Sequence, residues 1–266
     1  MSMPGTYFSE RLAAEISAEI ARGLGVSATV AELTTVPSSV LVDATDTVLE
    51  RMPEFVESWG AVALTPTPFS PVVDGVVLPD APWPALARGA ARGIDLLAGH
   101  TRDEYSLFNS SPGIAVTDQL VADVYRAAYP EATVGQLHDI INSDWLFRMP
   151  CLHLADAHHA GGGRPWVYEL CWSFDPVLGA SHSLDFLLVF GTLSPSAASE
   201  VTQVSEQMRA DWVRFAATGD PGWAPYDPLT RSTRVYDAEP STQPYPEERS
   251  RRIWHTHRFG TLDLND

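Results

Sequence analysis

Two side chains in this sequence have the residue types and surroundings for acid–base chemistry. Ile94, Leu96 and Leu97 form a short apolar run that predicts a buried strand, and Gly99 is expected to let the backbone bend. Glu104 follows in a polar turn, so the strand is expected to place this carboxylate at its carboxyl end. In open α/β sheets, the loops at that end converge on one crevice while the strands behind them stay rigid. His182 lies later in the chain, in a polar loop that runs into the apolar segment 186–190. A carboxylate that orients an imidazole is part of a Ser-His-acid system, in which the imidazole acts as the base.

The elements expected around this pair include both helices and strands. A helix is predicted from about Ser9 to Leu24, because an apolar residue recurs there at every fourth position. Strand-like runs cover residues 165–170 and 234–236. A long amphipathic helix is expected to start at Ser194-Pro195 and to continue to Phe215.

Two further stretches carry local structural signals. Asp74 and Gly75 predict a small turn that joins two extended runs within residues 72–77. Residues 142–160 are expected to be helical apart from a break at Pro150.

Four motifs of this chain resemble the type-B carboxylesterase family, which includes the cholinesterases and the bacterial p-nitrobenzyl esterases. They are FSPVVDGVVLP (69–79), LLAGHTRDEYSLF (96–108), GASHSLDFLLVFG (179–191) and FAATGDPGW (215–223), and they occur in the family's order. The resemblance implies an α/β-hydrolase fold with a mostly parallel sheet flanked by helices. It also implies a hydrolase for small-molecule esters.

The resemblance also implies a role for each member of the acid–base pair. Glu104 would be the acid and His182 the general base of a serine esterase triad. The neighbouring Asp103 is a rival for the acid, but the family motif has its acid second in the Asp-Glu pair. Asp103 is therefore expected at the start of a helix.

The nucleophile of the family is not found upstream of Glu104. That nucleophile is a Ser in a G-x-S-x-G elbow between a strand and a helix, with an oxyanion hole further upstream. The nearest approach is Gly25-Val26-Ser27-Ala28-Thr29, which lacks the second Gly and follows a helix, so Ser27 is not expected to be a nucleophile. The opening residues MSMPGTYFS resemble family sequence just downstream of the elbow.

We therefore expect residues 1–266 to form a single incomplete α/β-hydrolase domain that lacks the half with the nucleophile elbow. Such a chain is expected to be inactive alone. Two alternatives stay open: a non-catalytic, cholinesterase-like interaction module, and one half of a split esterase that an N-terminal half completes in trans.

Composition excludes several other classes of function. The 34 acidic and 17 basic residues give a formal net charge of −17, and every basic residue is Arg. Nucleic acids and anionic membranes are therefore not expected as partners. The absence of Lys excludes a Walker A loop and a pyridoxal phosphate Schiff base, and no cofactor is expected. Without a membrane span or a signal-peptide pattern, the chain is expected to be cytoplasmic.

Three remaining clusters have a structural explanation. Cys151 and Cys171 are expected to be buried thiols. The residues His153, Asp156, His158 and His159 match no known metal-ligand signature and are expected on a solvated helix surface, so no metal site is predicted. The glycines 161–163 superficially resemble an esterase oxyanion loop, but they lie downstream of the acid and are expected to form a surface turn.

Overall fold

The computed structural model describes residues 5–108, 119–193 and 199–265, and these residues form two compact units. The first, called here the sheet unit, contains residues 82–108, 119–193 and 199–259 together with Gly5. The second, called here the helical unit, contains residues 6–81 and 260–265. Each unit is described separately below.

The sheet unit is built on four strands in the order β3-β4-β5-β6. Strands β3 (Leu96–Thr101), β4 (Pro165–Leu170) and β5 (Ser232–Tyr236) are parallel, and β6 (Ser241–Pro244) pairs with β5 in the antiparallel direction. The strands predicted over residues 165–170 and 234–236 are confirmed. β6 was not predicted, because a short and fully exposed strand has no apolar pattern.

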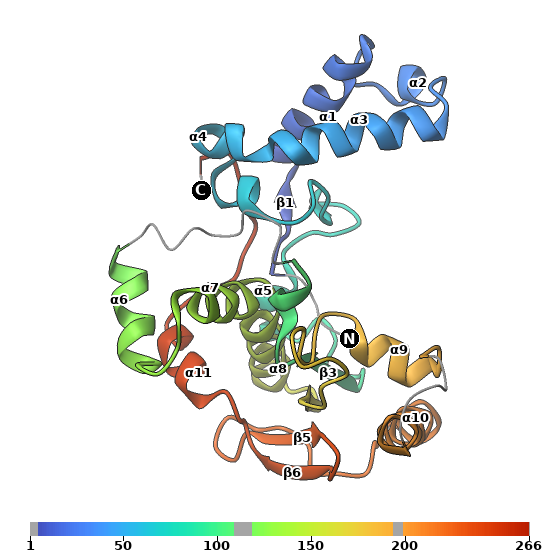
Figure 1. Cartoon of the computed structure of the whole chain (residues 1–266). Helices are drawn as coiled ribbons and strands as arrows, with labels where there is room; N and C mark the ends of the chain where they lie inside the picture. The colour runs from blue at the N-terminus through green and yellow to red at the C-terminus, as the bar shows by residue number, and fades with distance from the viewer. Residues whose placement is uncertain (1–4, 109–118, 194–198, 266) are drawn as a thin grey trace. The chain divides into compact units, whose positions relative to one another are not determined.

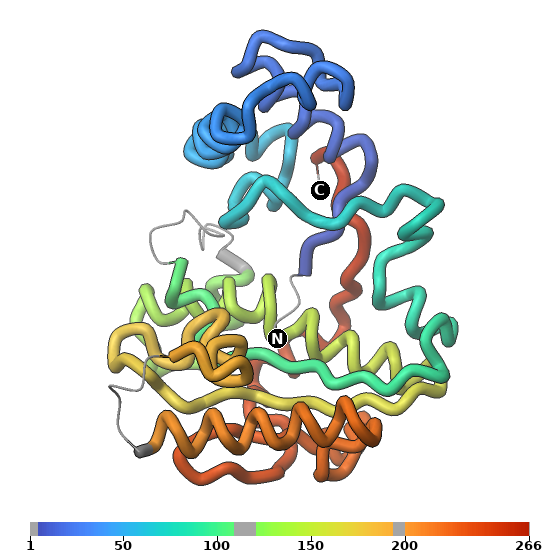
Figure 2. Tube along the Cα trace, turned by 90° about the vertical axis from the view of Figure 1, so that its right-hand side faces the viewer, coloured from blue at the N-terminus to red at the C-terminus, as the bar shows by residue number. Residues whose placement is uncertain are grey.

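Helices cover both faces of this sheet (Figure 2). Side chains alternate between the two faces along a strand. On one face, Tyr168 and Leu170 pack with α9 (Leu184–Phe190) and with the buried side of α10 (Ser199–Thr218). On the opposite face, α8 (Met149–Ala160) runs along β3 and β4. The predicted apolar face of α10 is confirmed at Val201, Val204 and Met208, whereas the predicted start at Ser194-Pro195 lies outside the described residues.

Gly99 lies inside β3 and is not the bend that the sequence suggested. A Cβ atom at this position would lie 2.3 Å from the carbonyl oxygen of Tyr168 on the neighbouring strand. Only glycine permits this close approach between β3 and the Tyr168 side chain and backbone. Ile94 lies before the strand and is exposed.

Figure 1 also shows the remaining helices of the sheet unit. They are α5 (Pro82–Ala87), the 3₁₀ helix η3 (Glu104–Phe108), α6 (Gln119–Ala128), α7 (Val134–Ser143), the π-helical turn η4 (Asp144–Arg148) and α11 (Glu248–Trp254). The break expected at Pro150 is wrong, because this proline lies in the first turn of α8, where its missing N–H is not needed. Among the described residues, no helix is both long and apolar enough to cross a membrane.

The helical unit is organised around α1 (Glu10–Leu24), which the sequence predicted. Its Leu12, Ile16 and Ile20 pack against Val48 and Met52. The other elements are β1 (Phe8–Ser9), α2 (Val30–Leu33), α3 (Ser38–Arg51), η1 (Met52–Phe55), α4 (Val56–Trp59), η2 (Gly60–Leu64) and β2 (Val72–Val73).

One predicted extended run in the helical unit is wrong. β2 pairs in parallel with β1, and no strand is formed by Val76 and Val77. The Asp74 carboxylate instead accepts the backbone N–H groups of Val76, Val77 and Leu78, each at 2.9 Å. These bonds fold the segment into a compact turn around Asp74.

Candidate functional site

Glu104 and His182 are brought together at the carboxyl end of β3. Glu104 begins η3, three residues after the strand ends, and its side chain is fully buried. One carboxylate oxygen, Oε1, accepts the backbone N–H of Thr101 at 2.7 Å. The other, Oε2, lies 2.6 Å from Nδ1 of His182. Because both oxygens are held, the carboxylate has a fixed orientation toward the imidazole.

The bond to Glu104 determines the tautomer of His182. A carboxylate can only accept, so Nδ1 carries the proton, and the neutral ring has its lone pair at Nε2. Burial lowers the pKa of His182, but the hydrogen bond and negative charge of Glu104 outweigh burial, and the pKa lies above its ordinary value. Within the described residues, no hydrogen bond is made to Nε2. The ring is thus a base whose protonated form is stabilised in place.

Two aromatic rings pack against this imidazole. The centroid of Phe147, in η4, lies 4.6 Å from that of His182, and Phe108, at the end of η3, lies at 5.4 Å. The two phenyl rings stack on each other at 6.1 Å with an interplanar angle of 13°. An apolar wall of this kind restricts water and strengthens the Glu104–His182 interaction. Neither aromatic residue was identified from the sequence, because only the folded chain brings them to the ring.

Asp103, the rival for the acid, contacts the histidine loop in a different way. It directly precedes η3, and its carbonyl oxygen accepts the N–H of Ser106 in the first turn of that helix. Its carboxylate accepts the backbone N–H of Ala180 at 2.9 Å and forms an ion pair with Arg102 at 3.1 Å. This contact with the loop that carries His182 was missed in the sequence.

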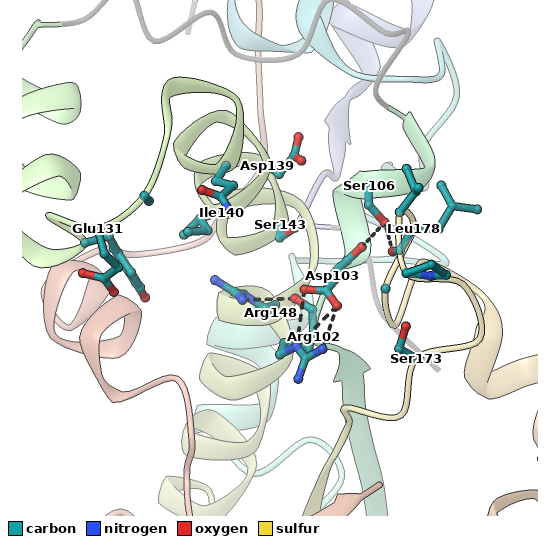
Figure 3. A pocket seen from close by; sticks show the side chains of 16 residues that line it. Arg102, Asp103, Ser106, Glu131, Asp139, Ile140, Ser143, Arg148, Ser173 and Leu178 are labelled. Carbon is teal, nitrogen blue, oxygen red and sulfur yellow. Dashed lines mark hydrogen bonds and ion pairs between the residues drawn. The ribbon is translucent and has the colours of Figure 1, made fainter. Parts of the chain in front are cut away.

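A cavity of about 490 Å³ is lined in part by residues on either side of the acid in the sequence (Figure 3). Arg102, Asp103 and Ser106 form part of its wall, and α7 and residues 173–179 contribute other parts. Polar and charged side chains gather around it, as Figure 3 shows. Neither Glu104 nor His182 lines this cavity, although Asp103, the neighbour of Glu104, does.

Two sequence features with a superficial resemblance to esterase motifs lie in turns. Ser27 lies between α1 and α2, where its hydroxyl donates to Glu32 at 3.1 Å, and a helix precedes it. The glycines 161–163 form the turn from α8 to β4, where the N–H of Gly163 donates to the carbonyl of His158. Neither segment has the strand-turn-helix context of a nucleophile elbow.

The polar cluster on α8 and the two cysteines were given a structural explanation from the sequence, and their surroundings can be compared with it. On α8, Asp156 accepts the Tyr226 hydroxyl at 2.8 Å. The expectation that His158 is solvated is wrong, because this side chain is buried. Across the described ranges, no group of three or more His, Cys, Asp or Glu side chains could hold a metal ion. Cys151 and Cys171 are buried and form no disulfide, as predicted, and burial raises the pKa of Cys171.

The fold and the site together define the class of this protein. A mostly parallel sheet flanked by helices, with an acid and an imidazole meeting at the carboxyl ends of its strands, is characteristic of an α/β-hydrolase. Solved structures with this fold superpose well on the chain. A PNB esterase covers 94% of this chain with a TM-score of 0.72 and 27% identity. A carboxylesterase from Geobacillus stearothermophilus covers 93% with a TM-score of 0.72 and 26% identity.

Sequence comparison identifies the family. No family model matches the chain. The para-nitrobenzyl esterase of Bacillus subtilis is 32% identical over an alignment of 212 residues, and the match covers 69% of this chain and 42% of that protein. Carboxylesterase 1D of Mus musculus is 25% identical over an alignment of 205 residues, and the match covers 60% of this chain and 36% of that protein. The chain belongs to the type-B carboxylesterase family and is consistent with a C-terminal portion of it.

The chain spans only part of these relatives. The aligned region covers 36–42% of the curated relatives and about 55% of the solved structures. The activity of the complete relatives therefore enters only as a proposal for this chain.

Proposed function

We propose that Glu104 and His182 are the acid and the general base of a serine carboxylic ester hydrolase that acts on small-molecule esters. The observation that carries this proposal is the 2.6 Å contact between Nδ1 of His182 and Oε2 of a fully buried Glu104. Related proteins named as esterases support the reaction class. Ester hydrolysis by this route requires no metal or organic cofactor.

The proposed reaction uses the imidazole twice. First, Nε2 of His182 takes the proton of a serine hydroxyl while that oxygen attacks the ester carbonyl, and Glu104 stabilises the imidazolium. The imidazolium then gives this proton to the leaving alcohol, which produces an acyl-enzyme. In the second half, Nε2 takes a proton from water while the water oxygen attacks the acyl group. The imidazolium then returns this proton to the serine oxygen as the bond to the acyl group breaks, which releases the acid and restores the serine hydroxyl.

We further propose that the nucleophile and the oxyanion hole come from residues outside these 266. The sequence contains no G-x-S-x-G elbow before Glu104. On this proposal, both units belong to one α/β-hydrolase domain, which is completed either within a longer polypeptide or by a separate chain in trans. Removing the nucleophile of such a triad costs about as much as removing the whole triad, roughly 10⁶-fold in kcat, so the chain alone is inactive.

Hydrolysis of p-nitrophenyl acetate tests this proposal. The rate is measured for the purified chain, and again after completion by the polypeptide encoded upstream of Met1, either fused in frame or mixed in trans. Each preparation is compared with His182→Ala and Glu104→Gln, and with His255→Ala as a control for an exposed histidine. The isolated chain and its variants are expected to show the same background rate. The completed protein should be active, and both site variants should lose several orders of magnitude while the control does not.

Two outcomes contradict separate parts of the proposal. A completed protein with background activity would refute the hydrolase and favour a non-catalytic interaction module. A His182-dependent rate in the isolated chain would show that this chain contains its own nucleophile.

A further inference from the structure

We infer that Asp103 and Ser106 form a clamp that positions the base of the proposed esterase by holding the backbone of its loop. The clamp is defined by the bonds from these two side chains and their backbones to residues 178–180. The inference rests on the proposed function for the role of His182 as a base, but the hydrogen bonds that define the clamp do not depend on that role. Asp103 and Ser106 are positioning residues, since they act through the loop and not on a reacting atom.

The first half of the clamp is a double hydrogen bond between Asp103 and Ala180. The N–H of Asp103 donates to the carbonyl oxygen of Ala180 at 2.9 Å. In return, Oδ2 of Asp103 accepts the N–H of Ala180 at 2.9 Å. These bonds hold both the N–H and the carbonyl of Ala180, which lies two positions before His182. Asp103 also forms a parallel β-bridge with Ser181, the residue after Ala180. A loop held at both groups of one residue has little freedom to rotate there.

The second half is the hydroxyl of Ser106. Its oxygen lies 2.5 Å from the carbonyl oxygen of Leu178 and 2.7 Å from that of Asp103. Both carbonyls are acceptors, so the hydroxyl proton joins the histidine loop to the turn that carries the acid. Figure 3 shows Ser106 between these two partners at the edge of the cavity.

Gly179, between the two contact points, gives independent support for the clamp. Its φ of +63° lies in the left-handed region, which favours glycine. A Cβ atom there would also lie only 2.2 Å from Oδ2 of Asp103. A side chain at this position would push the Asp103 carboxylate away from the Ala180 N–H. The loop is therefore shaped to admit that carboxylate.

The Asp103 turn is itself anchored to the sheet. The N–H of Arg102 donates to the carbonyl oxygen of Leu170, the last residue of β4, at 2.9 Å. The carbonyl oxygen of Arg102 accepts from Nη1 of the buried Arg148 at 3.1 Å. Because Glu104 follows Asp103 directly, one rigid turn holds both the acid and the loop of the base. The short contact between Glu104 and His182 thus depends on the bonds from Asp103 and Ser106 to the backbone of residues 178–180, in which neither the Glu104 nor the His182 side chain takes part.

The titration of His182 tests this inference without requiring a nucleophile. In the ¹⁵N-histidine-labelled chain, NMR follows the midpoint of the His182 titration and the low-field proton on Nδ1. Glu104→Gln supplies the reference for a broken acid–base contact. Asp103→Ala is expected to lose the low-field signal and to move the midpoint at least halfway toward that reference. Asp103→Asn keeps an acceptor oxygen for the Ala180 N–H and should restore both readouts.

Two further variants control for general damage. Asp139→Ala removes another acid that lines the same cavity but whose hydrogen bond is to His138, so the His182 signals should not change. Ser106→Ala removes the hydroxyl contacts to the carbonyl oxygens of Leu178 and Asp103 but leaves both bonds between Asp103 and Ala180, so it should shift the midpoint in the same direction by less than Asp103→Ala. This variant keeps the inference testable where Asp103→Ala does not fold, which circular dichroism would reveal.

If Asp103→Ala folds, an unchanged His182 midpoint in that variant would overturn the clamp. If only Ser106→Ala folds, an unchanged midpoint in Ser106→Ala would overturn it. Failure of the proposed function is distinguishable from failure of the clamp. Shifted His182 signals together with an inactive completed protein would refute the esterase alone. An active completed protein with unchanged signals would refute the clamp alone.

Discussion

His100 on β3 and Glu169 on β4 lie opposite each other in the parallel register, and both side chains are fully buried. Burial, together with the charge of Arg148, lowers the pKa of His100 to about 3. Burial and the charge of Glu247 raise the pKa of Glu169 well above its ordinary value. Both shifts favour the uncharged forms of these neighbours and therefore oppose an ion pair between them. Their opposite shifts limit the stable pH range of the fold from both sides.

His100→Gln should make the fold less sensitive to acid. Burial favours the neutral ring of His100, in which Nδ1 donates to the Thr101 carbonyl and Nε2 accepts the Tyr245 hydroxyl. The unfolded chain takes up a proton near pH 6.5, whereas the folded chain does so only near pH 3. Stability therefore falls as the pH falls through this window, by up to about 1.4 kcal/mol per pH unit. Urea denaturation at several pH values should show a shallower dependence in the variant.

The exposed His255 supplies the control for this measurement. His255→Gln should leave the pH dependence as it is in the parent chain. Equal slopes in all three proteins would mean that His100 becomes protonated in the folded state at ordinary pH.

Glu169→Gln should stabilise the fold increasingly as the pH rises. The folded chain keeps a proton on Glu169 above the ordinary pKa of the carboxyl, while the unfolded chain releases it. The parent chain therefore loses stability as the pH rises from the ordinary pKa toward the raised value. An amide has no such proton to lose. The free energy of unfolding at pH 8, minus that at pH 5, should be larger in the variant, whereas Glu239→Gln at an exposed site should match the parent.

Arg148→Met should be strongly destabilising. Nη2 of Arg148 lies 2.6 Å from Oδ1 of Asp144, and the side chains are only 4% and 0% exposed. The substitution would leave the Asp144 carboxylate in the interior without its cation, which costs about 3–5 kcal/mol. Arg252→Met, at a side chain that is 74% exposed, should cost no more than about 1 kcal/mol.

A double variant separates the charge from the packing of this pair. Arg148→Met combined with Asp144→Leu removes the orphaned carboxylate and should recover part of the loss. A double variant that is as unstable as the sum of the two single variants would show that charge burial is not the cause.

Gly99→Ala should destabilise the sheet by about 1–3 kcal/mol or more, because the new methyl group would overlap with Tyr168. Gly135→Ala is the matched control in α7, since a methyl group there would meet no atom within 4 Å beyond the backbone of its own helix. That control should be stabilising by about 0.4–1 kcal/mol. Thermal unfolding of the two variants should move in opposite directions, and a shift of Gly99→Ala toward higher temperature would contradict the packing between β3 and β4.

The elements that the sequence predicted are those with local patterns. The apolar spacing in α1 and the apolar runs of β4 and β5 depend on burial within each segment, so they can be recognised without the rest of the chain. The π-helical turn before α8 has no comparable signal, because one extra residue per turn hardly changes the apolar pattern. Gly99 was misread for a related reason: a glycine that bends a chain and one that admits a neighbouring ring are identical in sequence.

The candidate site likewise contains residues that the sequence could indicate and contacts that it could not. Glu104 and His182 could be nominated because their flanking motifs occur in a recognisable order, and the structure brings their side chains together. The tilted contact between Phe147 and the imidazole depends on a helical turn that returns from elsewhere in the chain. The bonds from Asp103 to Ala180 involve main-chain groups, which every residue has, so no residue type at position 180 could have indicated them.

The polar strand β6 limits the directions in which this sheet can be enlarged. It is four residues long, exposed along its whole length and antiparallel to its neighbour, and it ends in Pro244, which has no N–H to donate. Such a margin is a poor template for a further strand and protects against stacking of one molecule onto another. Within the described sheet, the opposite margin is β3. Any strand that is added in register is thus directed to the side of the sheet where the acid lies, so assembly of a larger sheet and assembly of the reaction centre would occur at the same edge.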